Sequence, residues 1–210
     1  LGWEQTRRNL LHELDSDFLF FHPTRHDWVE GTGHADKGND VFLRAFCSLR
    51  DSGARVGLVC CSWGSNVEES KALLDDRGCE SYVRWVAPLA IIPFERMCLG
   101  ADIVVDQFKL GAFGGVVFKA MAVGTPILTY LDESLLSRQY SEQPPVVNCR
   151  TAEEIVEKMK TIIASSEQLA DIANDSREWM IRFHSKQTTV NKQIDQFRLQ
   201  PLIGLTLNTK

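Results

Sequence analysis

The feature that most constrains the fold of this chain is an alternation of short apolar runs with longer stretches of helical periodicity. The apolar runs have the length of strands and are rich in residues that strands favour. They cover residues 17–22, 55–60, 82–86, 103–106, 126–130 and 146–148. Such an alternation is typical of βαβ units, and the right-handed crossover rule then favours a mostly parallel, six-stranded, doubly wound sheet.

The stretches between these runs predict helices on both faces of the sheet. Ser65 can cap one of them, with Glu68 as the other half of a capping box and Gly78 at its end. Thr151 and Glu154 form a second capping box. The expected helices cover residues 39–50, 66–76, 89–99 and 116–123, and two more follow Thr151.

The composition is that of an ordinary globular protein and excludes several functions. With 210 residues, 44% of them hydrophobic, the chain can bury the core of one large domain. A net charge of −5 without a dense run of lysine and arginine argues against a nucleic-acid-binding surface. The longest apolar stretch, residues 88–105, is interrupted by Glu95, Arg96 and Asp102, so we expect no transmembrane helix.

The cysteines and the first residues predict the cellular compartment of the protein and whether the chain is part of a longer one. The six cysteines form no CxxC pair and lie mostly in apolar segments, a pattern that indicates a reducing cytoplasm. The chain begins Leu-Gly-Trp-Glu, without methionine or a signal-peptide pattern. We expect a piece of a longer cytoplasmic protein, with a lead-in over residues 1–16, a ligand-binding domain over 17–185 and a tail over 186–210.

The predicted topology selects the loops where a ligand would bind. In doubly wound sheets, ligands bind beyond the carboxyl ends of the strands. The corresponding loops cover residues 23–37, 62–66, 87–88, 106–115 and 130–133.

Two cations, Arg25 and Lys37, lie in the first of these loops, and Lys37-Gly38 directly precedes the helix over residues 39–50. An arginine fork and a lysine charge near a helix N-terminus can hold a diphosphate, because exposed amides and the helix dipole add to the two charges. The alternative is that both side chains are solvated surface charges.

A glycine-rich turn, Gly111-Ala112-Phe113-Gly114-Gly115, follows the fourth strand and runs into a helix. Glycine lets the backbone approach an anion closely and leaves amides pointing toward it. Tight turns also need glycine when no ligand is bound, so the turn alone allows both interpretations.

In order along the chain, several segments resemble the C-terminal domain of the GT-B glycosyltransferases of family 4, or glycosyl transferases group 1, over roughly residues 18–183. The segments are Pro23-Thr24-Arg25, Lys37-Gly38-Asn39-Asp40, residues 101–107, Gly111-Ala112-Phe113-Gly114 and residues 119–126. The resemblance implies an α/β fold, namely a Rossmann-like three-layer αβα domain that forms the C-terminal half of a GT-B fold. It also implies that the domain binds a nucleoside-diphosphate sugar.

The resemblance assigns a role to each candidate residue. Arg25 and Lys37 would hold the donor diphosphate as the catalytic candidates, assisted by the amides of Gly114 and Gly115, and Pro88 lies in the loop that would flank the base. The other donor-binding candidates are Gly38, Trp63, Gly64, Asp106, Gln107, Gly111, Phe113 and Lys119.

The chain departs from the family at two positions where the family has glutamates, because Gly111 and Lys119 stand there. A lysine cannot accept hydrogen bonds from ribose hydroxyls. Either the ribose is held differently, with help from Asp106 or Gln107, or donor binding is weakened or lost. Lys119 also matches the position of the pyridoxal-phosphate lysine of glycogen phosphorylases, although the neighbouring phosphorylase residues are absent.

These implications combine into a glycosyltransferase donor domain that acts with retention on an unknown acceptor and needs no separate cofactor. Its partners would be the sugar donor and an N-terminal half of the same protein, through which it could reach a membrane; alone it should bind donor without transferring it. His22, His26 and His34 match no zinc spacing, so we expect no metal. The alternatives are a catalytically silent GT-B-like module and another GT-B enzyme, such as a phosphorylase or a sugar-nucleotide epimerase.

Overall fold

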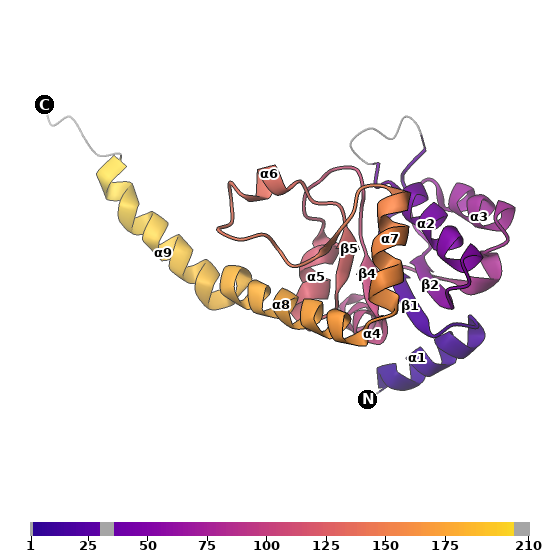
Figure 1. Cartoon of the computed structure of the whole chain (residues 1–210). Coiled ribbons are helices and arrows are strands. Elements are labelled where there is room, and N and C mark those ends of the chain that lie inside the picture. The colour runs from indigo at the N-terminus through magenta and orange to yellow at the C-terminus, as the bar shows by residue number, and fades with distance from the viewer. Residues whose placement is uncertain (1, 30–35, 204–210) are drawn as a thin grey trace, which may run out of the picture.

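The computed structural model describes residues 2–29 and 36–203, and it contains the predicted sheet (Figure 1). The six strands lie in the order β3-β2-β1-β4-β5-β6, and every neighbouring pair is parallel. Their bounds are β1 Phe18–His22, β2 Val56–Cys61, β3 Val83–Val86, β4 Ile103–Val105, β5 Ile127–Thr129 and β6 Val147–Asn148. Each strand overlaps a predicted run, so the α/β, doubly wound fold is confirmed.

Helices cover both faces of the sheet. The helices α2, α3 and α7 pack over one face, and α1, α4, α5 and α8 pack over the other. Their bounds are α1 Gly2–Glu13, α2 Asn39–Asp51, α3 Val67–Asp76, α4 Ile91–Gly100, α5 Gly115–Val123, α6 Glu133–Leu136, α7 Ala152–Ile163, α8 Ser166–His184 and α9 Lys186–Ile203. A short 3-10 turn, Glu80–Tyr82, precedes β3.

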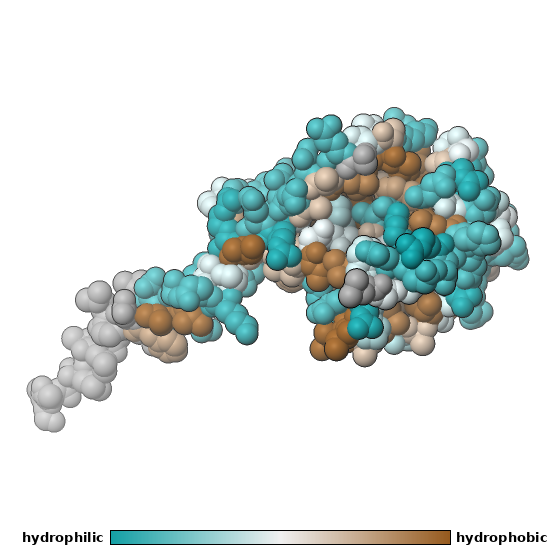
Figure 2. Space-filling model, turned by 90° about the horizontal axis from the view of Figure 1, so that it is seen from below, coloured by the Kyte–Doolittle hydropathy of each residue, from teal (hydrophilic) through white to brown (hydrophobic). Residues whose placement is uncertain are grey.

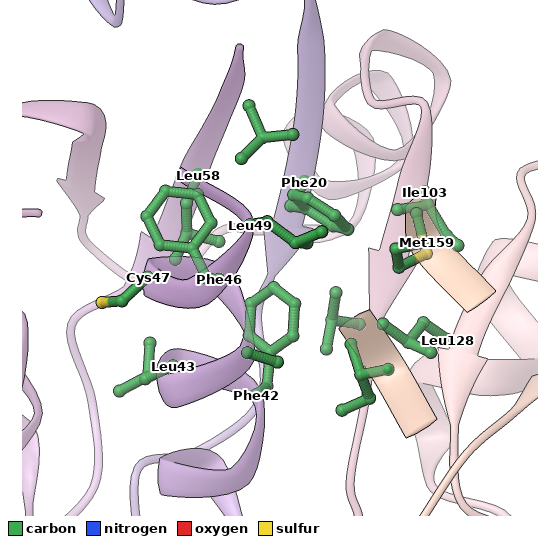
Figure 3. Packing of buried hydrophobic residues seen from close by; sticks show 14 of the residues in the cluster. Phe20, Phe42, Leu43, Phe46, Cys47, Leu49, Leu58, Ile103, Leu128 and Met159 are labelled. Atoms are coloured by element: carbon green, nitrogen blue, oxygen red, sulfur yellow. The ribbon is translucent and has the colours of Figure 1, made fainter. Parts of the chain in front are cut away.

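The central strand β1 shows why the sequence forms this sandwich. All five of its residues are buried, as expected for a parallel strand covered on both faces. Phe18 and Phe20 belong to the core beneath α2 and α7, whereas Leu19 and Phe21 belong to the core beneath α4 and α5. Figure 3 shows the first of these cores, in which the rings of Phe20 and Phe42 lie 5.3 Å apart between their centroids.

One of the two predicted capping boxes forms and the other does not. The Thr151 side chain caps α7, and the Glu154 side chain accepts from the Thr151 amide, as predicted. The box of Ser65 and Glu68 was wrong: α3 begins one residue later, after Asn66, and has no side-chain cap. The loop before α3 bonds elsewhere, because Asn66 Oδ1 accepts from the amide of Trp28 at 3.0 Å.

Both ends of the described chain are helical, which the sequence pattern did not predict. Leu10 of α1 and the following Leu14 are buried in the core beside α4, and Arg7 forms an ion pair of 2.9 Å with Asp102. Helix α9 continues from α8 away from the sheet (Figure 1), and hydrophobic residues lie along this arm (Figure 2). In residues 2–29 and 36–203, no helix is both long and apolar enough to cross a bilayer.

Candidate functional site

A cleft of about 470 Å³ lies beyond the carboxyl ends of β1, β2 and β4. At this point β1 pairs with β2 on one side and with β4 on the other, which is the switch point where doubly wound sheets bind ligands. The cleft is lined by Pro23, Thr24, Arg25, Lys37, Cys61, Trp63, Pro88, Leu89, Phe94, Asp106, Gly114, Gly115, Val116 and Lys119. A smaller cavity of about 240 Å³ between α1 and α4 is mostly apolar and contains neither Arg25 nor Lys37, so we place the site in the larger cleft.

Arg25 is held in the loop after β1 by an ion pair with the buried carboxylate of Asp27. Asp27 in turn accepts a hydrogen bond of 2.7 Å from the Ser65 amide, so the loops after β1 and β2 brace each other. The Arg25 side chain is 41% exposed. Because a guanidinium carries five N–H donors, pairing with one carboxylate leaves donors available to a ligand in the cleft.

Lys37 is held by an uncharged partner. Its ammonium donates to Oε1 of Gln107 at 2.8 Å, and Nε2 of Gln107 donates to the Ala112 carbonyl at 2.7 Å. The Lys37 carbonyl also accepts from the Phe108 amide at 2.9 Å. The loop before α2 is therefore fastened to the loop after β4, and the lysine charge is positioned without being neutralised.

The glycine-rich turn brings backbone amides to the cleft. Helix α5 begins at Gly115, with Gly114 at the N-cap position and no side-chain cap on its first amides. Both glycines line the cleft. Uncapped amides at a helix N-terminus favour an anion, so this end of α5 complements the two cations.

Asp106 follows β4 and is 2% exposed. Its Oδ1 accepts from the Thr24 hydroxyl at 2.9 Å, whereas Oδ2 has no hydrogen-bond partner among the described residues. Burial raises the pKa of the Asp106 carboxyl above its usual value, and the Thr24 hydroxyl, the Lys37 charge and the Gly114 amide oppose that shift. This carboxylate thus lies near the Lys37 charge and is protected from solvent.

His22 and His26 form a buried layer behind the cleft. His22 Nδ1 donates to the Val105 carbonyl at 3.1 Å, and His22 Nε2 accepts from Nδ2 of the Asn39 side chain at 2.9 Å, which fixes a neutral ring. His26 Nδ1 lies 2.9 Å from the Ser70 hydroxyl. Burial lowers the pKa of His22 to about 4, against the opposing Val105 hydrogen bond, and burial together with His22 lowers the pKa of His26 to about 3.

Histidines in one region can indicate a metal site, so we searched the described part of the chain for clusters of metal-binding side chains. No group of three or more histidine, cysteine, aspartate or glutamate side chains gathers there. His34 lies outside the described residues.

The structure brings together eight of the thirteen residues that the sequence selected. Those in the cleft are Arg25, Lys37, Trp63, Pro88, Asp106, Gly114, Gly115 and Lys119. The indole nitrogen of Trp63 donates to the Pro23 carbonyl at 2.8 Å, so this ring is fixed at the rim although it is 43% exposed. Lys119 is exposed, with its ammonium 5.1 Å from the centre of the Phe94 ring. This exposure does not favour a Schiff-base lysine, which needs a desolvated amine.

The other five selected residues lie beside or behind the cleft. Gly38, with a φ of +64°, forms the turn into α2, and Gly111, with a φ of +65°, packs against Asp132. Gly64 has a φ of +108°, and a Cβ there would lie 2.5 Å from the His26 carbonyl oxygen. Gln107 supports Lys37 from behind.

Phe113 turns into the core. Its ring centroid lies 4.8 Å from that of Phe118 and 5.9 Å from that of Trp179. The structure therefore gives this aromatic residue of the glycine-rich turn a packing role against α8.

The cleft also contains residues that the sequence reasoning did not select. They are Pro23, Thr24, Cys61, Phe94 and Val116, whereas Leu89 belongs to the loop expected to flank the base. Pro23 and Thr24 precede Arg25 in a loop already chosen, so position alone could have found them. Phe94 lies inside α4 and packs like any core residue, with 8% exposure, and no sequence signal marks it.

No family model and no curated protein sequence matches this chain. Among solved structures, Anabaena HepE in complex with UDP and glucose matches with a TM-score of 0.72 and 18% identity, over 94% of this chain and 52% of that chain. A glycosyltransferase from Rickettsia africae matches with a TM-score of 0.69 and 14% identity, over 96% and 53%. The C-terminal domain of the group 1 glycosyl transferase LpcC from Francisella tularensis matches with a TM-score of 0.63 and 16% identity, over 86% and 93%.

This chain thus spans about half the length of HepE and of the Rickettsia enzyme, but nearly all of the isolated LpcC domain. The three likenesses agree with the sequence resemblance and with the six-stranded parallel sheet. The chain has the Rossmann-like fold of the C-terminal half of GT-B glycosyltransferases.

Proposed function

We propose that this chain is the donor-binding domain of a glycosyltransferase and that its cleft binds a nucleoside-diphosphate sugar. The observation that carries the proposal is the convergence of Arg25, Lys37 and the uncapped amides at Gly114 and Gly115 on one cleft. These groups come from two separate halves of the chain and all favour negative charge. Together they complement a diphosphate.

The other wall of the cleft suits a base. Trp63, Pro88, Leu89 and Phe94 provide apolar surface beyond the ends of β2 and β3. A nucleoside diphosphate has the same division into a flat apolar part and a charged part. The HepE structures contain UDP or UDP-glucose, so uridine nucleotides are the first ligands to test.

In the reaction that we propose, the bond between the sugar and the diphosphate breaks and negative charge develops on the departing phosphate oxygen. Arg25 and Lys37 stabilise that charge from fixed positions, because Asp27 and Gln107 already orient them. The acceptor would be held by an N-terminal half of the protein, which agrees with the half-length match to HepE. Retention of anomeric configuration rests on the family resemblance.

Thermal shift measurements of this chain with UDP, GDP, ADP and their sugar conjugates test the proposal. A ligand at about a hundred times its Kd adds roughly 2.7 kcal/mol, which raises the Tm of a domain of this size by about 5–10 °C. We expect a rise with one base, and we expect Lys37→Ala to remove most of it. The control is Lys160→Ala, because Lys160 is an exposed lysine on α7.

The second candidate function is a catalytically silent GT-B-like module, which the presence of Gly111 and Lys119 at the two glutamate positions favours. Such a module would keep the GT-B fold but would not bind a nucleotide. If none of the nucleotides shifts the Tm, that result would support the silent module and would contradict the donor-binding proposal.

A further inference from the structure

Asp106 is the carboxylate that lines the cleft in the described part of the chain. Asp106 lines the cleft and is 2% exposed, and its buried Oδ2 accepts no hydrogen bond of ordinary geometry from the described residues, although the Gly114 amide lies near the carboxylate. Leaving a buried acceptor without a hydrogen bond costs free energy of folding. A polar atom in this state inside a ligand cleft indicates that the ligand supplies the partner.

The neighbouring Gln107 does not compete for this role. Its Oε1 accepts from Lys37 at 2.8 Å and its Nε2 donates to the Ala112 carbonyl at 2.7 Å, so both ends of its amide are occupied within the protein. Asp106 and Gln107 were the two residues that could hold a ribose in place of the absent glutamates. Because the Gln107 side chain is occupied, Asp106 is the better candidate.

The backbone of Gly114 lies directly against the buried Oδ2 of Asp106. A Cβ built on Gly114 would lie 2.2 Å from Oδ2, so any side chain at this position would displace the carboxylate. Gly114 has a φ of −88°, which every residue can adopt, and its backbone conformation therefore does not require glycine. Glycine is required here because the carboxylate approaches the start of α5 so closely.

The partner of Oδ2 must be a hydrogen-bond donor that fits beside a diphosphate. An ionised carboxylate repels phosphate oxygens but accepts strongly from a hydroxyl. In a nucleoside-diphosphate sugar, hydroxyl groups flank the diphosphate on both sides, on the ribose and on the hexose.

We propose that Asp106 is a specificity-determining residue of the cleft, whose Oδ2 accepts a hydrogen bond from a hydroxyl of the hexose or the ribose next to the diphosphate. This inference rests on the proposed donor-binding function. It assigns Asp106 to recognition of a neutral group, whereas Arg25 and Lys37 bind charge.

The test is a comparison of Kd values for four probes, measured by calorimetry with the native chain and with Asp106→Ala. The probes are UDP-glucose, UDP, 2′,3′-dideoxy-UDP and inorganic pyrophosphate. If the partner is a hexose hydroxyl, the variant should bind UDP-glucose about tenfold or more weakly and UDP unchanged. If the partner is a ribose hydroxyl, the variant should bind UDP more weakly by the same factor and should bind dideoxy-UDP as the native chain does.

Two further variants complete the design. Asp106→Asn preserves the shape if the alanine variant does not fold, and it should lose part of the same discrimination because a neutral acceptor forms a weaker hydrogen bond. Asp75→Ala, which removes an exposed carboxylate of α3, is the matched control and should leave all four Kd values unchanged.

The outcomes separate this inference from the function on which it rests. If Asp106→Ala weakens the binding of all four probes equally, pyrophosphate included, or weakens none, the proposed role of Asp106 is overturned. The donor site itself would still stand as long as the native chain binds UDP. A native chain that binds none of the four probes would overturn both.

Discussion

The ammonium of Lys37 lies 2.8 Å from the uncharged side-chain oxygen of Gln107, so the protein orients this cation without cancelling its charge. Placing a carboxylate there should cancel it. We expect Gln107→Glu to weaken binding of UDP by about tenfold or more, measured by calorimetry, because Lys37 would then pair with the protein rather than with the diphosphate.

The matched control for this change is Gln107→Met, which also loses the bond to the Ala112 carbonyl but adds no charge. The expected order of UDP affinity is native, then methionine, then glutamate. If the methionine and glutamate variants bind UDP equally, the charge of Lys37 does not contribute to the site.

Lys119 should contribute to nucleotide binding through its charge. It is exposed in the cleft, and no ion pair joins it to a carboxylate in the described part of the chain. We expect Lys119→Met, which can keep the packing on Phe94, to weaken UDP binding by about fivefold at low salt, with the loss shrinking above roughly 0.5 M salt. Lys160→Met on α7 is the control, and tighter UDP binding by the Lys119 variant would contradict an electrostatic role.

Gly114 should be required because of what lies next to it. Gly114→Ala places a methyl group against Oδ2 of Asp106, so the carboxylate must rotate away from the Thr24 hydroxyl. We expect a loss of about 1–2 kcal/mol in the free energy of unfolding, measured with denaturant. Gly115→Ala meets no atom within 4 Å and should leave this free energy near its native value, so equal losses in the two variants would exclude the proposed clash.

The two buried histidines should make the protein less stable in mild acid. Burial lowers the pKa of His22 to about 4 and that of His26 to about 3, whereas an unfolded histidine titrates near 6.5. Below about pH 6.5 the unfolded chain therefore binds protons that the folded protein excludes. Stability should fall as the pH is lowered, by on the order of 2 kcal/mol at pH 5 from His22 alone.

Denaturant unfolding between pH 7 and pH 5 measures this effect, and His22→Asn should reduce it. His12→Gln, on the exposed surface of α1, is the control. The raised pKa of Asp106 acts in the opposite sense, so the series is repeated with Asp106→Asn to remove that contribution. An unfolding free energy that did not fall between pH 7 and pH 5 would show that the histidines are not neutral and buried in solution.

The fold was predictable because its strands are buried on both faces. A strand such as Phe18–His22 reads as a continuous apolar run, and helical periodicity separates it from the next run. Helix α1 escaped prediction because its sequence is mostly polar and buries Leu10 through contact with α4, which no local pattern reveals. The Ser65 cap failed for a related reason, since the loop before α3 bonds to the loop after β1: the Ser65 amide donates to Asp27, and the Asn66 side chain accepts from the Trp28 amide.

The site was predictable to the extent that topology decides it. The carboxyl-end rule and the glycine-rich turn placed Arg25, Lys37 and Gly114 in one cleft. Phe113 shows the limit of this reasoning, because the direction of a side chain within a turn depends on the aromatic residues of α8 that receive it. Phe94 was missed for the opposite reason, since it is one of the few buried residues of the mostly exposed helix α4 and still lines the cleft.

The pairing of β1 with β4 has a consequence for how the protein is made. It pairs Phe20 with Ile103, which lie far apart in the sequence, whereas β1 and β2 are consecutive strands. During synthesis the segment with both cations emerges well before the turn that faces them, and meanwhile one edge of the apolar strand β1 has no partner. Such an edge attracts strands of other chains, so the interval before β4 emerges is when a nascent copy is most exposed to aggregation, and when a chaperone would matter most.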